Sequence, residues 1–212
     1  MQLKTFIFSP FSENTYVLYD DSKECIIVDP GCYDDFERSE LTRFIAANEL
    51  KPVKLLNTHC HLDHVFGNAF VMKEYGLDLI IHPKDLITLQ WAKPAATKYG
   101  LEMEESPKPS GYFDMEKGFS FGDTHLEIRF CPGHAPGHVA FIHHETKTII
   151  GGDVLFQGSI GRTDLPGGDF EVLKKSIEEQ FYSLPDDYLV YSGHGPETSI
   201  GLEKRQNAFV RG

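Results

Sequence analysis

The segment Thr58-His59-Cys60-His61-Leu62-Asp63-His64 places three imidazoles and one carboxylate on one short stretch of chain. Neutral imidazole nitrogen is the commonest zinc ligand in proteins, and carboxylate oxygen is a frequent partner. Packing does not account for four such groups together, because each buried group would need its own polar partner. His59 and His61 point to the same side of an extended segment, whereas Asp63 and His64 follow the turn into a predicted helix. The segment therefore predicts two neighbouring metal positions.

Four cysteines occur in the chain, without C-x-x-C spacing: Cys25, Cys32, Cys60 and Cys131. A chain of this size and acidity does not need disulfides, so we expect reduced thiols. Cys60 lies inside the histidine cluster but alternates with His59 and His61, and we interpret it as a small buried side chain.

Further ligand-type residues follow the apolar segments that we predict to be strands. Each of three such segments leads to one of them: 126–130 to His134, 148–150 to Asp153 and 188–191 to His194. Glycines flank these residues and permit the sharp turns and close backbone approach that a compact site needs. The carboxyl ends of strands are the expected place for function in a protein of sheets and helices.

The ordered set of histidines and aspartates resembles the metal-binding motifs of the metallo-β-lactamase superfamily. Within that superfamily the chain is most similar to glyoxalase II-type hydrolases, and the segments 158–164 and 192–198 resemble a short subgroup of them. The strand and helix patterns by themselves predict an α/β fold with mixed sheets. The resemblance implies a four-layer αββα sandwich.

The resemblance also implies which residues bind metal. One metal would be held by His59, His61 and His134, and a second by Asp63, His64 and His194, with Asp153 bridging both. Nitrogen and oxygen ligands of this kind suit zinc, iron or manganese in a two-metal site. We expect two divalent metal ions, with zinc preferred.

Three more residues are expected around these ligands. Asp29 matches a family loop residue that is not a ligand, and we expect it to orient the histidine loop. His138 is predicted to support the site or the fold and not to bind metal. Arg162 is predicted at the rim of the site, where it would either attract an anionic substrate or brace Asp164.

Composition narrows the possible partners. Hydrophobic residues make up 41% and charged residues 25% of the 212 residues, and we expect one domain over 1–212. The formal net charge of −12 argues against nucleic acid or anionic membrane as a partner, since both require a basic surface. The N-terminus lacks the apolar region of a secretory signal, and no run approaches the ~18 apolar residues of a spanning helix. We expect a cytoplasmic protein.

Local patterns predict the remaining elements. Short apolar runs predict strands over 5–8, 15–19, 25–28, 53–56 and 79–81. Helical spacing predicts helices over 34–48, 64–75, 169–183 and 201–209. The segment 83–117 is expected to form a helix and then a loop that crosses near the site.

The leading functional hypothesis is a dinuclear metal-dependent hydrolase of small thioesters such as S-lactoylglutathione. Two metals can share a hydroxide at neutral pH, polarise a carbonyl and hold the developing oxyanion. Asp63 would bind one metal and also orient the hydroxide. A thiolate leaves without a strong general acid, and the sequence offers no obvious acid beyond the ligands. No G-x-S-x-G nucleophile motif competes for the role.

Two alternatives remain open. A persulfide dioxygenase with a single iron shares the fold and a similar Gly-Arg-Thr-Asp segment, while the Ser192-Gly193-His194-Gly195 segment favours the hydrolase. A metal-binding or interaction domain without catalysis is disfavoured by the complete ligand set. Full-length glyoxalase II proteins carry a C-terminal helical domain that grips glutathione, whereas eighteen residues follow His194 here. We therefore expect weak discrimination among thiol carriers.

Overall fold

Two six-stranded sheets face each other in the computed structural model, which describes residues 1–212. Neighbouring strands of the first sheet follow chain order: β1 (Gln2–Phe8), β2 (Glu13–Tyr19), β3 (Glu24–Val28), β4 (Lys51–Leu56), β5 (Leu79–Ile81) and β6 (Gly111–Tyr112). The strands β1 to β3 pair antiparallel, and β3 to β6 pair parallel. The predicted strands of this half are confirmed: β5 has the predicted bounds, and the other four begin one to three residues earlier.

The second sheet uses the later strands. Its order is β7 (Phe119–Phe121), β8 (Thr124–Phe130), β9 (Val139–His143), β10 (Thr148–Gly152), β13 (Leu189–Ser192) and β14 (Thr198–Ser199). Only β10 and β13 pair parallel, and a separate hairpin joins β11 (Leu155–Phe156) to β12 (Ser159–Ile160). The sheets are thus mixed, as expected. The sequence analysis did not predict β9, in which all five residues are buried, because a buried strand lacks the alternation of a half-exposed one.

Alternation along the strands divides the apolar side chains into layers. In β3, Ile26 and Val28 belong to the core between the two sheets, whereas Ile27 belongs to the core under the helices. The same period of two in β10 sends Ile150 inward and Ile149 outward. Each sheet therefore has an apolar face on both sides and needs a helical layer outside it.

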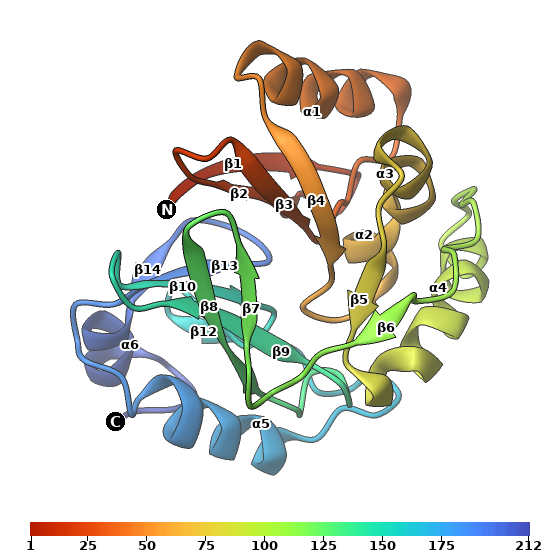
Figure 1. The fold of residues 1–212 in the computed structure, drawn as a ribbon. Coiled ribbons are helices and arrows are strands. Elements are labelled where there is room, and N and C mark those ends of the chain that lie inside the picture. The colour runs from red at the N-terminus through yellow and green to blue at the C-terminus, as the bar shows by residue number, and fades with distance from the viewer.

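The helices supply those outer layers. Their bounds are α1 (Asp35–Ala47), α2 (Leu62–Val65), α3 (Asn68–Tyr75), α4 (Leu86–Lys98), α5 (Phe170–Ser176) and α6 (Ile200–Gln206). The first four belong to the half with the first sheet, and α5 and α6 cover the second (Figure 1). This is the four-layer αββα arrangement expected from the resemblance. None of these helices combines the length and apolar content that crossing a membrane requires.

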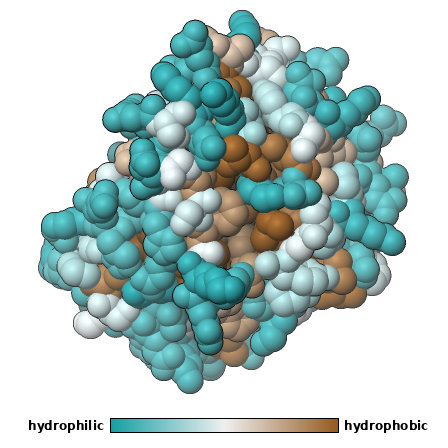
Figure 2. Space-filling model, viewed as in Figure 1, coloured by the Kyte–Doolittle hydropathy of each residue, from teal (hydrophilic) through white to brown (hydrophobic).

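The surface is mainly hydrophilic, with one apolar concentration in this view. Figure 2 shows hydrophobic side chains gathered near the middle of the face, and hydrophilic ones around them. The apolar concentration lies near the middle of the view, in the region between β4 and β7 of Figure 1.

The predicted helix over 64–75 is wrong in one respect, because two helices occupy this region. The break falls at Gly67, whose backbone N–H donates to the carbonyl of Pro30 at 2.7 Å. A Cβ at this position would lie 2.4 Å from the Cys32 sulfur and 2.8 Å from the Pro30 carbonyl oxygen. The close approach to the Pro30 loop excludes a side chain and interrupts the helix.

The other helix predictions hold with shifted ends. Asp34 caps α1 by accepting from the Glu37 N–H, and Asp169 caps α5 by accepting from the Val172 N–H. The helix after Asp169 continues beyond Ser176 as a wider π-type turn, Ile177–Phe181. The last helix ends at Gln206 and not at 209, because the Asn207 side chain accepts from the backbone N–H groups of Phe209 and Val210. The segment 83–117 forms the expected helix and loop, and β6 lies within the loop.

Candidate metal centre

Strand ends from both sheets deliver the candidate ligands to one place. The histidine loop follows β4, and His134 follows β8. Asp153 follows β10 directly, and His194 lies just beyond β13. The seven candidate ligands therefore meet at the ends of four strands, although they span 136 positions of the chain, from 59 to 194.

Three histidines form the first group. Nδ1 of His61 lies 2.8 Å from Nε2 of His134, and that atom lies 3.2 Å from Nε2 of His59. Each of these contacts joins two ring nitrogens, and each nitrogen that carries no proton offers a lone pair to the space between them. A central cation would satisfy all three at once.

The second group contains Asp63, His64 and His194. Oδ2 of Asp63 lies 3.1 Å from Nε2 of His194 and 3.9 Å from Nε2 of His64. The potential ligand atoms of this group lie within 4.8 Å of one another, as do those of the first group. Each group thus has the size and donor chemistry of a metal site.

Asp153 lies between the two groups. Its Oδ2 is 3.5 Å from Nε2 of His134 in the first group and 3.6 Å from Nε2 of His194 in the second. Its Oδ1 is 3.4 Å from Nε2 of His64, and both of these atoms are buried without a hydrogen-bond partner. Buried polar atoms that lack partners are costly, so a cation bound between them fits the donor set.

Outward contacts hold several imidazoles in the orientation that metal binding needs. Nδ1 of His134 donates to the carbonyl of Arg162 at 2.8 Å, and Nδ1 of His194 donates to the carbonyl of Phe11 at 3.2 Å. A carbonyl accepts only, so the proton resides on Nδ1 and the Nε2 lone pair points into the cluster. This is the arrangement by which proteins orient metal-binding histidines.

The Asp29 carboxylate holds the histidine loop in place through contacts with Thr58 and His64. Its carboxylate accepts from the Thr58 N–H at 2.7 Å and from the Thr58 hydroxyl at 2.5 Å, and it lies 3.1 Å from Nδ1 of His64. The Asn57 amide donates to the His64 carbonyl at 3.0 Å. Asp29 also lies within reach of His59, but its oxygens are already occupied by these donors.

His138 and Arg162 lie around the ligands. The His138 ring stacks on that of His59 with 4.7 Å between centroids, and its Nε2 accepts from the Asp153 N–H. Arg162 makes two hydrogen bonds of 2.7 Å to the Asp164 carboxylate. Of the two roles considered for Arg162, the contact that is present is the brace to Asp164.

Burial and charge adjust the protonation of the site in the absence of metal. Burial lowers the pKa of His59, His61 and His134, that of His61 to about 3. Burial disfavours ionisation of Asp153, but the charges of the surrounding histidines dominate and hold its pKa below the usual range. The first group is therefore neutral and the Asp153 carboxylate is ionised at neutral pH, which are the forms that bind metal.

Sequence analysis missed several buried polar residues around the cluster. Glu13 is fully buried, and its Oε1 lies 3.8 Å from Nδ1 of His64. The Asn14 amide donates to the carbonyls of Ser192 and Gly195 on either side of the His194 loop. The only signal in the sequence is the polar run Ser12-Glu13-Asn14, which is typical of a turn.

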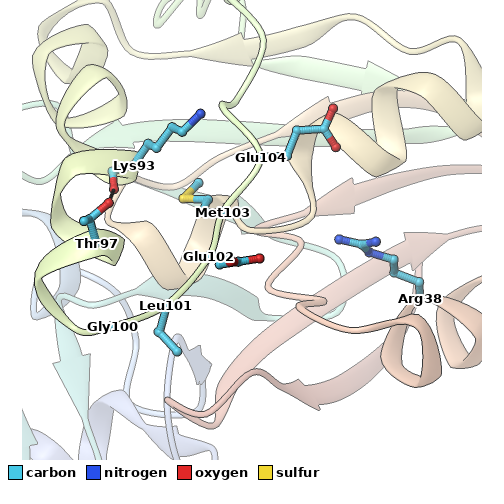
Figure 3. Close-up of a pocket in the computed structure, with 8 residues that line it drawn as sticks. All are labelled: Arg38, Lys93, Thr97, Gly100, Leu101, Glu102, Met103 and Glu104. Atoms are coloured by element: carbon cyan, nitrogen blue, oxygen red, sulfur yellow. Dashed lines mark hydrogen bonds between the residues drawn. The ribbon is translucent and has the colours of Figure 1, made fainter.

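A cavity of about 700 Å³ lies outside the metal cluster. Figure 3 shows Arg38 on one side of it, Lys93 and Thr97 on another, and the segment 100–104 crossing between them. None of the candidate ligands lines this cavity. The four cysteines are free and buried, as expected of reduced thiols.

Similarity to a known family agrees with this geometry. The model of the family described as the metallo-beta-lactamase superfamily matches residues 9–194. The chain belongs to the metallo-β-lactamase superfamily. A hydroxyacylglutathione hydrolase, GloC, of Haemophilus influenzae is 37% identical over 99% of this chain and 98% of its own length. A probable metallo-hydrolase, YqgX, of Bacillus subtilis is 36% identical over 100% and 99%.

Solved structures of other superfamily members share the whole fold. The B3 metallo-β-lactamase BLEG-1 superposes with a TM-score of 0.90 at 33% identity and covers 100% of both chains. TTHA1623, solved in a di-iron-bound form, superposes with a TM-score of 0.85 at 35% identity over 98% of this chain and 100% of its own. This superfamily member is therefore a metallo-hydrolase with a site for divalent metal, and the resemblance seen in the sequence is confirmed.

Proposed function

We propose that this superfamily member is a dinuclear metal-dependent hydrolase of small thioesters, acting as one domain over 1–212. The convergence of two ligand groups on one shared carboxylate carries the proposal. In it, His59, His61 and His134 hold one metal, Asp63, His64 and His194 hold the other, and Asp153 serves both. The donor set of nitrogens and oxygens suits zinc, iron or manganese.

When bound, two such metals supply hydroxide at neutral pH and polarise the carbonyl that it attacks. The chain's own residues then orient the reactants. The Asp63 side chain is 12% exposed, and its Oδ2 lies 3.1 Å from Nε2 of His194. Asp63 would bind its metal and also orient the attacking oxygen. The sequence offers no obvious acid beyond the ligands to protonate a leaving group, which favours a thiolate because it leaves unprotonated.

Thioester chemistry is also supported by the similarity to GloC, which is named a hydroxyacylglutathione hydrolase. A second candidate is β-lactam hydrolysis, because BLEG-1 is similar over the entire chain. The same nucleophile can attack a lactam carbonyl. The absence of a further acid disfavours this candidate, since an amide nitrogen must be protonated as it leaves.

The test compares three reactions of the metal-loaded protein. We expect release of free thiol from S-lactoylglutathione and from simpler thioesters, with at least about 100-fold loss of kcat in Asp63→Asn. Stoichiometric oxygen uptake with glutathione persulfide and a single bound iron would replace the proposal with a dioxygenase. Faster turnover of a chromogenic cephalosporin than of any thioester would favour the β-lactamase.

A further inference from the structure

One exposed aromatic residue packs against a residue that supports the metal cluster. Tyr99 directly follows α4, and its side chain is 56% exposed. Its ring meets that of Phe11 edge to face, with 5.5 Å between centroids. Phe11 is the residue whose backbone carbonyl accepts from His194. A single residue, Phe11, therefore lies between the Tyr99 ring and His194 of the second ligand group.

Tyr99 also lies near Arg162, which supports the first ligand group. The Asp164 carboxylate has the largest effect on the Arg162 guanidinium and raises its pKa. The nearby Tyr99 phenol raises that pKa further. Arg162 is the residue whose backbone carbonyl accepts from His134. Tyr99 thus packs on Phe11, which orients a histidine of the second group, and lies near Arg162, which orients one of the first.

A third ring lies on the other side of His194. The Phe156 ring is 6.3 Å from the His194 ring, and Phe156 is partly exposed at the start of the β11–β12 hairpin. We define Phe11, Tyr99 and Phe156 as the aromatic wall. They come from three separate segments, and only part of their surface is buried in the fold.

The aromatic wall offers apolar surface and little free charge. Arg162 is paired through two hydrogen bonds of 2.7 Å with Asp164. The carboxylates of Asp63 and Asp153 stand at the metal cluster itself. A charged substituent would find no free counter-ion here, whereas an apolar or aromatic one would gain contact with the rings.

We propose that Tyr99 is a specificity-determining residue and that the aromatic wall selects thioesters whose group next to the reacting carbonyl or sulfur is apolar or aromatic. The inference rests on the proposed function for the reaction itself. It adds the substrate class and the residue that sets it. Tyr99 lies in the segment 83–117, which the sequence predicted to cross near the site.

Binding of simple thiols tests the wall without requiring turnover. Phenylmethanethiol and ethanethiol present the same thiolate to metal, but only the first carries a ring. We expect calorimetry on the metal-loaded protein to give at least about 10-fold tighter binding of phenylmethanethiol. Tyr99→Ala should reduce this ratio to about 2-fold, and Tyr99→Phe should keep most of it. Trp91→Ala is the matched control, because Trp91 is 58% exposed on α4, the helix that Tyr99 directly follows.

Hydrolysis of benzoyl and acetyl thioesters of one thiol then separates the two proposals. If the wild type prefers the benzoyl substrate and Tyr99→Ala loses this preference, both the proposed function and the aromatic wall are supported. If the wild type hydrolyses no thioester but the thiol-binding ratio depends on Tyr99, the wall stands and the proposed function fails. If thioesters are hydrolysed but Tyr99→Ala leaves the ratio unchanged, or Trp91→Ala lowers it equally, the wall is overturned and the function stands.

Discussion

The backbone N–H of Asp153 donates a hydrogen bond of 2.9 Å to Nε2 of His138. This bond uses the Nε2 lone pair of a fully buried imidazole. His138 therefore does not offer Nε2 to a metal and instead fixes the backbone from which the shared carboxylate projects.

His138→Ala should weaken metal binding although it removes no ligand. Loss of a residue that orients a ligand typically costs 10- to 100-fold in metal affinity. The measurement is competition for metal against a chromogenic chelator, with His125→Ala as control because His125 is exposed on β8, outside the cluster. Equal affinity of His138→Ala and wild type would show that the bond to Asp153 has no orienting role.

Asp153→Ala should weaken both metal positions, because one carboxylate contacts both groups. We expect roughly two metals per wild-type chain and fewer than two tightly bound metals in the variant. Elemental analysis after dialysis measures the stoichiometry. Asp164→Ala is the control, since its carboxylate contacts Arg162 outside the cluster. Two tightly retained metals in Asp153→Ala would contradict the bridging role.

The metal-free protein should be most stable near pH ~6.5, the unfolded pKa of histidine. Burial lowers the pKa of His59, His61, His134 and His138, so the unfolded chain takes up more protons and stability falls as the pH drops below that value. Burial opposes ionisation of His64 and His194, but the carboxylates of Asp153 and Asp63 raise their pKa values. The stability that His64 and His194 contribute is therefore fully present below the pKa of histidine in the unfolded chain. It is lost as the pH rises through their pKa values in the folded protein.

Chemical denaturation of chelator-treated protein from pH 4 to 9 measures this profile. Bound metal should raise the free energy of unfolding most strongly above the maximum, where protons no longer compete for the ligands. A metal-free protein whose stability rises steadily down to pH ~4 would be inconsistent with neutral buried histidines.

Arg162→Ala should change KM for anionic thioesters by less than about 2-fold, because the guanidinium is already paired with Asp164. The pair is exposed, so thermal stability should also change little. Asp164→Ala should lower the KM for anionic thioesters by freeing Arg162. Steady-state kinetics with an anionic and a neutral thioester make the comparison, and a several-fold rise in KM confined to Arg162→Ala would assign Arg162 to the substrate.

Carrier specificity should be weak. The aromatic wall contacts only groups close to the reacting bond, so the distant part of a glutathione carrier contributes little binding energy. We expect similar kcat/KM for thioesters of glutathione and of a small thiol with the same acyl group. A KM in the low micromolar range for the glutathione thioester, lost on trimming the peptide, would reveal a dedicated carrier site.

Local patterns in the sequence determined the candidate ligands and most of the layers. The cluster around His59 and His64 is a matter of residue chemistry, and a continuous apolar run such as Ile26 to Val28 is typical of a strand buried on both faces. Such signals depend only on neighbours in the chain. They hold wherever the segment lies in the folded protein.

Only the tertiary structure decided how these parts meet. Asn14 holds the His194 loop from about 180 positions away, and the Tyr99 ring packs on Phe11, 88 positions before it in the chain. Gly67 breaks a helix because the Pro30 loop, distant in sequence, packs against it. No periodicity records contacts of this kind, since they depend on the positions of two sheets whose packing brings remote segments together.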